Sequence, residues 1–359
     1  MSQHKVFDGH NDLLARLYMA GGVQAAGQFR AGRPNGHLDA QKARDGGFGG
    51  GFFAIWVPGP QRPRTGGRQQ RSNPSDAMRE LHYDIPLPPT VPAADALRGA
   101  RVELDTLKAL EAEGSLTICT TADAIESVMA SDGIAAFLHM EGAEAIDPDF
   151  AVLDEFYAQG LRSLGPVWSR PTIYGEGVPF RFPGSPDIGN GLTEQGKRLV
   201  AKCNALKVLV DLAHLNEAGF WDVAQLSDAP LVATHSNVHA LCPHARNLTD
   251  KQLDSIAESG GVVGLNFAAA FLRADGRMRS DTPVSLMIEH LDYMIKRMGE
   301  DHVALGSDFD GAVVPAEIGS VAGLPVLVGA MQEHGYGDDL IAKICHGNWM
   351  RVIRLTQGH

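Results

Sequence analysis

The chain has 359 residues, of which 44% are apolar and 21% are charged. This length and composition fit one large globular domain, and we expect residues 1–359 to form a single barrel domain. The formal net charge of −12 excludes broad binding to a phosphate backbone, which needs clustered Lys and Arg. No nucleic-acid partner is therefore expected.

Neither a membrane segment nor a disulfide framework is evident from the sequence. No apolar run reaches the roughly 18 residues that a membrane helix needs, and the N-terminus lacks the apolar core of a signal peptide. The cysteines are scattered without a CxxC pair, at Cys119, Cys203, Cys242 and Cys345. We interpret them as small buried hydrophobes with reduced thiols, and we expect a cytoplasmic protein without a membrane partner.

Eight short apolar runs alternate with helix-like stretches along the chain. In order, they are Lys5–Phe7, Gly50–Val57, Ile134–Met140, Leu161–Leu164, Lys207–Leu212, Leu231–Thr234, Val262–Asn266 and His302–Gly306. Strand followed by helix, repeated eight times, favours a closed α/β barrel of the (β/α)8 TIM type. An open doubly wound sheet is the alternative, but no GxGxxG motif follows a strand to support its dinucleotide-binding form.

Helices and long loops complete this pattern. The clearest predicted helices are Asp149–Gln159, Thr193–Leu206, Thr249–Glu258 and Pro283–Met298. Two loops are unusually long, Pro58–Pro92 after the second strand and Pro166–Gly191 after the fourth. Because both leave the carboxyl ends of strands, where barrel enzymes hold their chemistry, we favour lids over surface decoration.

Six ionisable residues follow five of the predicted strands at their carboxyl ends. They are His10, Asp12, Glu141, His214, His235 and Asp308. Any one of them alone is more simply explained as a hydrogen-bonded core or surface group. The whole set is not explained by packing, because such groups avoid an apolar barrel mouth unless they are paired or bind a metal.

This mixture of side chains suits a two-metal hydrolytic site. Neutral imidazole and carboxylate are ligands of zinc and similar divalent ions. If Glu141 bridges two ions, the remaining His and Asp ligands give three protein ligands per metal and leave Asp308 as an acid or base. Two ions that share a water generate a hydroxide nucleophile near neutral pH. His139, two residues before Glu141, is interpreted as a supporting or core residue.

The same residues lie in motifs that resemble the membrane dipeptidase family of metallopeptidases, also called renal dipeptidase-like. The resemblance runs from Phe7 nearly to the C-terminus. Its motifs are DGHND at 8–12, MEG at 140–142, GLTEQGKRLV at 191–200, VDLAH at 210–214, THS at 234–236, HARN at 244–247, GSDFDG at 306–311 and GNW at 347–349. Each motif is short, and their order and spacing together carry the resemblance.

The resemblance implies two Zn²⁺ ions per chain. The implied ligands are His10 and Asp12 at one ion, His214 and His235 at the other, and Glu141 between them. It also implies that Arg246 receives the C-terminal carboxylate of the substrate and that Asp308 handles its amine and shuttles the proton. From the residue alone, a surface salt bridge is the commoner role for an arginine such as Arg246.

One position departs from the family pattern. Family members usually carry a histidine just after the fourth strand, near the scissile carbonyl, and Trp168 takes that place here. An indole donates one hydrogen bond but cannot act as an imidazolium. Either Arg170 or Tyr174 supplies the electrophile, or the metals suffice, and we expect Trp168 and Tyr174 among the substrate-binding residues.

The expected reaction is hydrolysis of a dipeptide by the metal-bridging hydroxide, including dipeptides with a D-residue at the C-terminal side. Another hydrolase on the same barrel, such as a lactonase or deacetylase, is the nearest alternative, because function depends on the pocket. A non-catalytic metal-binding homologue is the alternative from another class. A phosphoesterase is disfavoured because no phosphate-cradling Gly loop is present. The resemblance also implies a homodimer.

Overall fold

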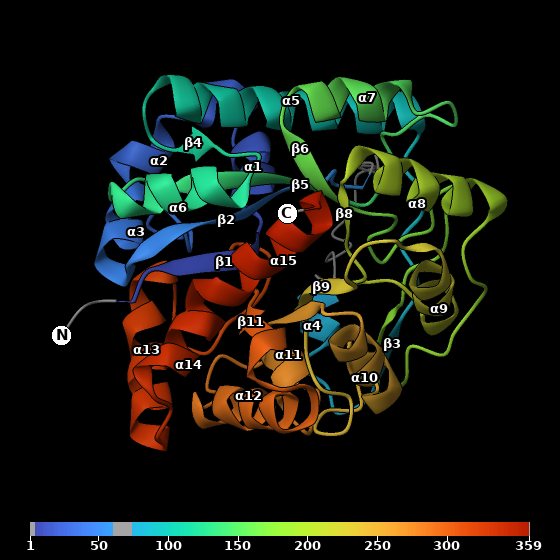
Figure 1. Cartoon of the computed structure of the whole chain (residues 1–359). Helices are drawn as coiled ribbons and strands as arrows, with labels where there is room; N and C mark the ends of the chain where they lie inside the picture. The colour runs from blue at the N-terminus through green and yellow to red at the C-terminus, as the bar shows by residue number, and fades with distance from the viewer. Residues whose placement is uncertain (1–3, 60–73, 359) are drawn as a thin grey trace, which may run out of the picture.

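The computed structural model describes residues 4–59 and 74–358, with the strands at the centre and helices around them (Figure 1). The eight main strands are β1 (Val6–Asn11), β2 (Phe48–Ile55), β5 (Ala135–Glu141), β6 (Leu161–Gly165), β8 (Leu209–Val210), β9 (Val232–Ser236), β10 (Val262–Leu265) and β11 (Val303–Leu305). Every strand that the sequence predicts is confirmed close to its expected position.

The main strands pair in parallel and in chain order, in two sheets. One sheet runs β1-β2-β5-β6-β8, with the short β4 (Thr117–Ile118) beside β5, and the other runs β9-β10-β11. Parallel bridges link the two sheets at both junctions, between Asp211 and Val232 and between Asn11 and Phe309. The chain is therefore an α/β protein built on parallel strands.

Helices follow most of the strands and cover their outer side (Figure 1). Those predicted from the sequence are confirmed as α7 (Ala151–Ala158), α8 (Glu194–Leu206), α10 (Asp250–Glu258) and α12 (Ser285–Met298). The others are α1 (Leu13–Met19), α2 (Gln28–Ala31), α3 (Ala40–Gly46), α4 (Pro74–Ala77), α5 (Ala93–Ala112), α6 (Ala122–Ala130), α9 (Glu217–Leu226), α11 (Ala269–Leu272), α13 (Leu324–His334), α14 (Asp338–Ala342) and α15 (Asn348–Gln357). Side-chain caps fix where some of these helices begin. At the start of α8, for example, the Thr193 hydroxyl accepts a hydrogen bond from Gly196 N.

An apolar layer fills the space between the strands. It includes one residue from each of seven main strands: Phe7, Phe52, Phe137, Leu209, Val232, Val262 and Ala304. Trp349 of α15 packs against this layer, 4.9 Å from the Phe52 ring, and its indole donates to Leu305 O at 3.0 Å. A Cβ at Gly9 would lie 2.4 Å from this indole, so only glycine fits there. One shared core thus holds nearly all the strands.

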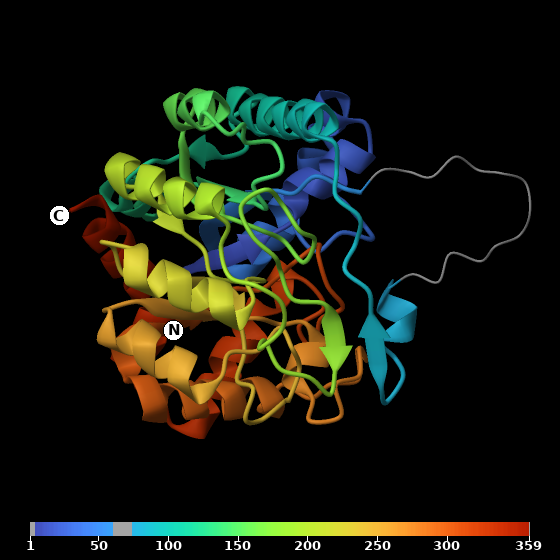
Figure 2. The ribbon, with the colours of Figure 1, turned by 90° about the vertical axis from the view of Figure 1, so that its right-hand side faces the viewer.

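The two long loops pair with each other. β3 (Tyr83–Ile85) from the first loop and β7 (Phe180–Phe182) from the second form an antiparallel ribbon, which lies beside the ends of the main strands in Figure 2. The ring of Phe180 lies 6.4 Å from that of His214, so the ribbon reaches the predicted site. The sequence also predicts a solvated loop around Arg62, Arg64, Arg68 and Arg71, and these arginines fall in residues 60–73, outside the described residues.

All four cysteines are free and buried, which confirms their interpretation as small core residues. Among the described helices, none combines the length and apolar character needed to cross a membrane.

Candidate metal centre and substrate site

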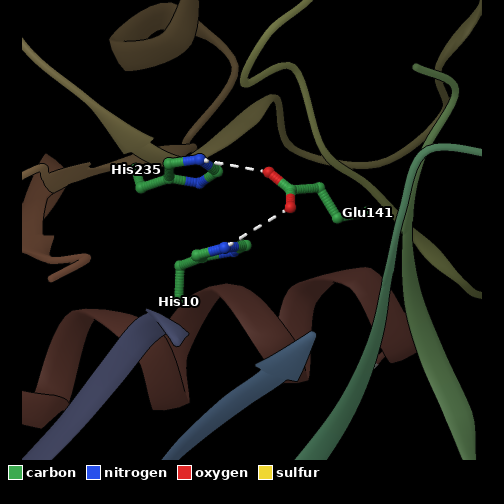
Figure 3. Close-up of side chains that lie close together, drawn as sticks. All are labelled: His10, Glu141 and His235. Carbon is green, nitrogen blue, oxygen red and sulfur yellow. Dashed lines mark ion pairs between the residues drawn. The ribbon is translucent and has the colours of Figure 1, made fainter. Parts of the chain in front are cut away.

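The carboxyl ends of four strands bring three histidines around one carboxylate. Glu141 ends β5, and its Oε1 lies 3.0 Å from Nε2 of His214 and 3.5 Å from Nε2 of His235. Its Oε2 lies 3.7 Å from Nε2 of His10. Figure 3 shows the carboxylate beside the stacked His10 and His235 rings, with one oxygen facing each ring. Glu141 is thus shared by three imidazoles.

Two aspartates extend this cluster from His10. Nε2 of His10 lies 3.8 Å from Oδ2 of Asp12. Ligand atoms of His10, Asp12 and Asp308 all lie within 4.8 Å of one another, as do those of His10, Glu141 and His235. The structure therefore brings together all six ionisable residues that the sequence places at strand ends.

The backbone is strained at two of these positions. His214 and Asp308 follow β8 and β11 and have φ of 67° and 60°. Such left-handed conformations are uncommon outside Gly, although Asn, Asp and His adopt them more often than other residues, and holding one costs about 1–3 kcal/mol. Strain of this kind concentrates at functional sites, where it aims a side chain.

A chain of hydrogen bonds fixes the tautomer of His235. The Thr234 hydroxyl donates to Asp211 Oδ2 at 2.7 Å, so it accepts from Nδ1 of His235 at 2.8 Å. Nε2 of His235 therefore carries a lone pair, and it lies 3.1 Å from Nε2 of His214. Nδ1 of His214 in turn lies 3.0 Å from the Ser169 hydroxyl. Support of the outer ring nitrogen is typical of metal-binding histidines.

Unpartnered polar atoms show that the cluster fits a cation. His10 is fully buried, yet neither of its ring nitrogens has a hydrogen-bond partner within the described part of the chain. Oδ1 of Asp12 is also buried and unpartnered there. Each such atom costs about 1–3 kcal/mol. Imidazole and carboxylate donors that converge in this way fit divalent metal ions.

Burial dominates the electrostatics of the cluster. It raises the pKa of Glu141 well above the usual range and raises that of Asp308 to about 7. Burial also lowers the pKa values of His214 and His235 well below their usual range, which keeps both rings neutral, as metal binding requires. Burial acts the same way on His10, but the carboxylates around it, Glu141 foremost, raise its pKa to about 10.

A family profile described as membrane dipeptidase (peptidase family M19) matches residues 1–358. The chain belongs to this family. A metallopeptidase of Rhodobacter sphaeroides, whose crystal structure holds a phosphinate mimic of the dipeptide L-Ala-D-Ala, is 50% identical. Its superposition covers 99% of this chain and 100% of that chain with a TM-score of 0.94.

Two further relatives support the membership. An uncharacterised protein in the pqqA 5′ region of Klebsiella pneumoniae is 51% identical over 254 residues, which are 70% of this chain and 94% of that protein. A dipeptidase of Claviceps purpurea is 26% identical over 353 residues, which are 97% of this chain and 76% of that protein. Family and solved structures together make the chain a metallodipeptidase, a hydrolase that acts on peptide bonds.

Trp168 lies beside the candidate metal-ligand cluster of this dipeptidase. Its ring is 5.8 Å from that of His214 and 5.9 Å from that of Phe180. Phe180 in turn stacks on Phe271 at 6.3 Å, with the two planes 1° apart. The three aromatic side chains form an apolar wall next to His214. At this position the chain therefore offers a hydrophobic surface instead of an ionisable group.

Arg170 supports that wall from behind. Its guanidinium lies 4.9 Å from the Trp168 ring and 5.4 Å from the Trp56 ring, a stacking that favours a cation. It donates to Val57 O at 2.8 Å, and its Nε lies 3.2 Å from Oε1 of Glu144. These contacts make Arg170 a buried support of the two indoles.

Arg246 is buried, so the role that its residue type alone favours, a surface salt bridge, is wrong. Its guanidinium donates to His235 O at 3.2 Å and lies 5.5 Å from the Phe271 ring, while Nε has no partner within the described residues. Burial lowers its pKa to about 10, and the charges of Asp308 and Glu141 act against that change. A buried guanidinium with unused donors is suited to an incoming carboxylate.

The structure corrects the prediction of a substrate contact for Tyr174. Its side chain is fully buried, and its hydroxyl donates to the carbonyls of Ile146 and Asp147 at 3.1 and 3.0 Å. The ring stacks on Phe150. Tyr174 therefore anchors its loop in the core and directs its hydroxyl away from the candidate metal-ligand cluster.

Three polar residues around the candidate ligands support the site. One of them, His139, was predicted to do so. His139 is buried, with Nδ1 2.9 Å from the Ser163 hydroxyl, as expected for a core or supporting residue. Asp8 of the DGHND motif accepts from Ser307 N and Oγ, which joins β1 to the turn that carries Asp308. Asn266, just after β10, donates to Asp308 and was not singled out from the sequence, although it too is a polar residue at a strand end.

Proposed function

We propose that this chain hydrolyses dipeptides with the help of two bound divalent cations. Because the proposed ligands are imidazoles and carboxylates, we propose that these cations are zinc. The proposed ligands are His10 and Asp12 at one ion, His214 and His235 at the other, and Glu141 at both. The observation that carries this proposal is the placement of Glu141, whose two oxygens face different histidines. Family membership supports a metal-dependent site of this kind.

We further infer that the main strands form a closed (β/α)8 barrel. The bridges at both sheet junctions support closure, as does an apolar layer with a residue from seven of the strands. In such a barrel, catalytic residues lie at the carboxyl ends of the strands, where this cluster lies. A single domain over residues 1–359, a homodimer and a cytoplasmic location stay predictions.

The chain's own residues would divide the work of hydrolysis. The bound cations would supply Lewis-acid polarisation of the substrate carbonyl and an activated water. Arg246 would bind the C-terminal carboxylate of the dipeptide with its free donors. Asp308 would take a proton from the attacking water and give it to the leaving nitrogen, because its carboxylate lies beside the proposed ligands His10 and Asp12. Trp168 would shield this step from bulk water.

The substrates that we propose include L,D-dipeptides with small side chains. The Rhodobacter sphaeroides relative binds a mimic of L-Ala-D-Ala and is 50% identical to this chain. The apolar wall of Trp168, Phe180 and Phe271 is compatible with such side chains, because it offers no charged group to them.

Metal content and activity on a panel of L,L- and L,D-dipeptides test the proposal in the purified protein and in Glu141→Gln. The matched control is Glu155→Gln, which changes a surface carboxylate paired with Arg101. We expect about two equivalents of zinc and cleavage of at least one dipeptide, both impaired only in Glu141→Gln. Bound metal without cleavage of any dipeptide would overturn the substrate class, and no bound metal after reconstitution would overturn the metal centre.

A further inference from the structure

Asn266 holds the carboxylate of Asp308 from a neighbouring strand. Its side-chain Nδ2 donates to Oδ2 of Asp308 at 3.1 Å, and the residue is fully buried. The two side chains follow β10 and β11, which pair in parallel, so the bond crosses the sheet at its carboxyl end. A buried amide that faces the proposed acid or base of the reaction is well placed to influence it.

Neighbouring bonds fix which way this amide points. Oδ1 of Asn266 accepts from Ala268 N at 2.6 Å, so the amino group is the part that faces Asp308. The backbone is held on both sides by Asn237, which donates to Asn266 O and accepts from Asn266 N, each at 2.9 Å. The donor is therefore preorganised and does not depend on the bond to Asp308 for its orientation.

The bond leaves the other oxygen of Asp308 for chemistry. A Cβ built at Gly311 would lie 2.1 Å from both Oδ1 of Asp308 and Oδ2 of Asp12, so these two oxygens approach the same point. Oδ1 is thus the oxygen on the Asp12 side, toward the metal ligands, while Oδ2 is occupied by Asn266. A carboxylate free to rotate would present either oxygen, or neither, to the reacting atoms.

We propose that Asn266 is a positioning residue, which holds Oδ2 of Asp308 so that Oδ1 exchanges the proton with substrate. This inference rests on the proposed function of Asp308. In each turnover Oδ1 gains the proton of the attacking water and loses it to the leaving nitrogen, while Asn266 keeps both of its amide protons. Asn237 contributes indirectly to the position of Asp308, because it fixes the backbone of Asn266.

A double-mutant cycle tests the proposal on the metal-loaded enzyme, with Asn266→Ala, Asp308→Asn and the double variant. Misplacing a catalytic group by about 1 Å can cost about 100-fold, and we expect Asn266→Ala to lower kcat by about 10- to 100-fold, with KM within about threefold and unchanged metal content. In the Asp308→Asn background the same change should alter kcat by less than about twofold. An equal loss in both backgrounds would show a merely structural role and overturn the proposal.

Two controls keep the result interpretable. Asn348→Ala removes another buried amide, which donates to Glu300 O and Val303 O, and it should lower stability while kcat stays unchanged. Asn266→Ser serves if Asn266→Ala does not fold. A crystal structure of the folded variant gives a readout that needs no activity: the Asp308 carboxylate should leave its present rotamer. An unmoved carboxylate would overturn the proposal, whereas a wild-type enzyme inactive on every dipeptide would instead overturn the proposed function.

Discussion

The hydroxyl of Thr234 lies 2.8 Å from Nδ1 of His235 and donates its own hydrogen bond to Asp211. This arrangement leaves Nε2 of His235 unprotonated before any cation binds, so no tautomer change is needed on binding. Thr234→Val removes the acceptor while it preserves the shape of the side chain. Loss of such an outer partner lowers metal affinity by about 10- to 100-fold.

Competition with a zinc chelator measures this affinity in the wild type and in Thr234→Val. Thr356→Val is the control, because Thr356 is also buried and its hydroxyl donates to Val352 O within its own helix, α15. Equal affinities in all three proteins would show that the hydroxyl plays no part in metal binding.

Arg246 is the buried cation that we assign to the substrate carboxylate. Truncating a buried charged partner costs about 2–5 kcal/mol, so Arg246→Ala should lower kcat/KM by about 30-fold or more for a dipeptide with a free C-terminus. The effect should lie mainly in KM. The matching substrate is the same dipeptide with an amidated C-terminus, on which the wild type should perform as poorly as the variant. Equal cleavage of free and amidated dipeptide by the wild type would remove this role from Arg246.

The strand framework could be predicted because its signals are local. Each main strand is a short apolar run, and a polar residue at its carboxyl end is visible without knowledge of the partners. β8 shows the limit: the run Lys207–Leu212 predicts it, but only Leu209–Val210 form the strand. How much of a run becomes strand depends on the neighbouring strands, which the run itself does not describe.

The support of the site could not be predicted, because it depends on contacts between distant segments. Asn266 and Asp308 are 42 positions apart, and an Asn after a strand is equally typical of a turn. The prediction for Tyr174 is wrong for a related reason. Whether its phenol faces the site or the core depends on the path of a long loop. Arg246 is buried beside Phe271 of α11, and the neighbouring Ala245 N donates to Arg181 O of β7, so its surroundings come from distant segments.

Asp308→Asn separates a proton-transfer role from a ligand role. Asn keeps the size of the side chain and one oxygen but cannot exchange a proton, so kcat should fall by about 10²–10⁴-fold. Metal content should stay at the wild-type value, measured by elemental analysis after gel filtration. Asp308 also lies within ligand distance of His10 and Asp12, and loss of one equivalent of metal in the variant would make it a ligand instead.

His290 lies outside the proposed metal-ligand cluster and makes the stability of the chain depend on pH. It is buried on α12, where Nδ1 accepts from Val238 N and Nε2 lies 3.0 Å from Leu272 O. A neutral ring satisfies both contacts, whereas a protonated ring would turn a second N–H against that of Val238. Burial lowers the pKa of His290 to about 4, and the bond to Leu272 O acts against this change.

The sign of the effect follows from linkage. Between the ordinary histidine pKa of 6.5 and about 4, the unfolded chain binds the proton and the folded chain does not, so stability is lost as the pH falls through this window. His290 alone should cost about 2 kcal/mol of unfolding free energy between about pH 7 and about pH 4.5. Denaturant unfolding of the metal-free wild type and of His290→Gln at both pH values measures it as the difference between the two proteins. His82 is exposed, so the control variant His82→Gln should lose as much unfolding free energy at low pH as the wild type. If His290→Gln also lost as much as the wild type, His290 would not be the source of the pH dependence.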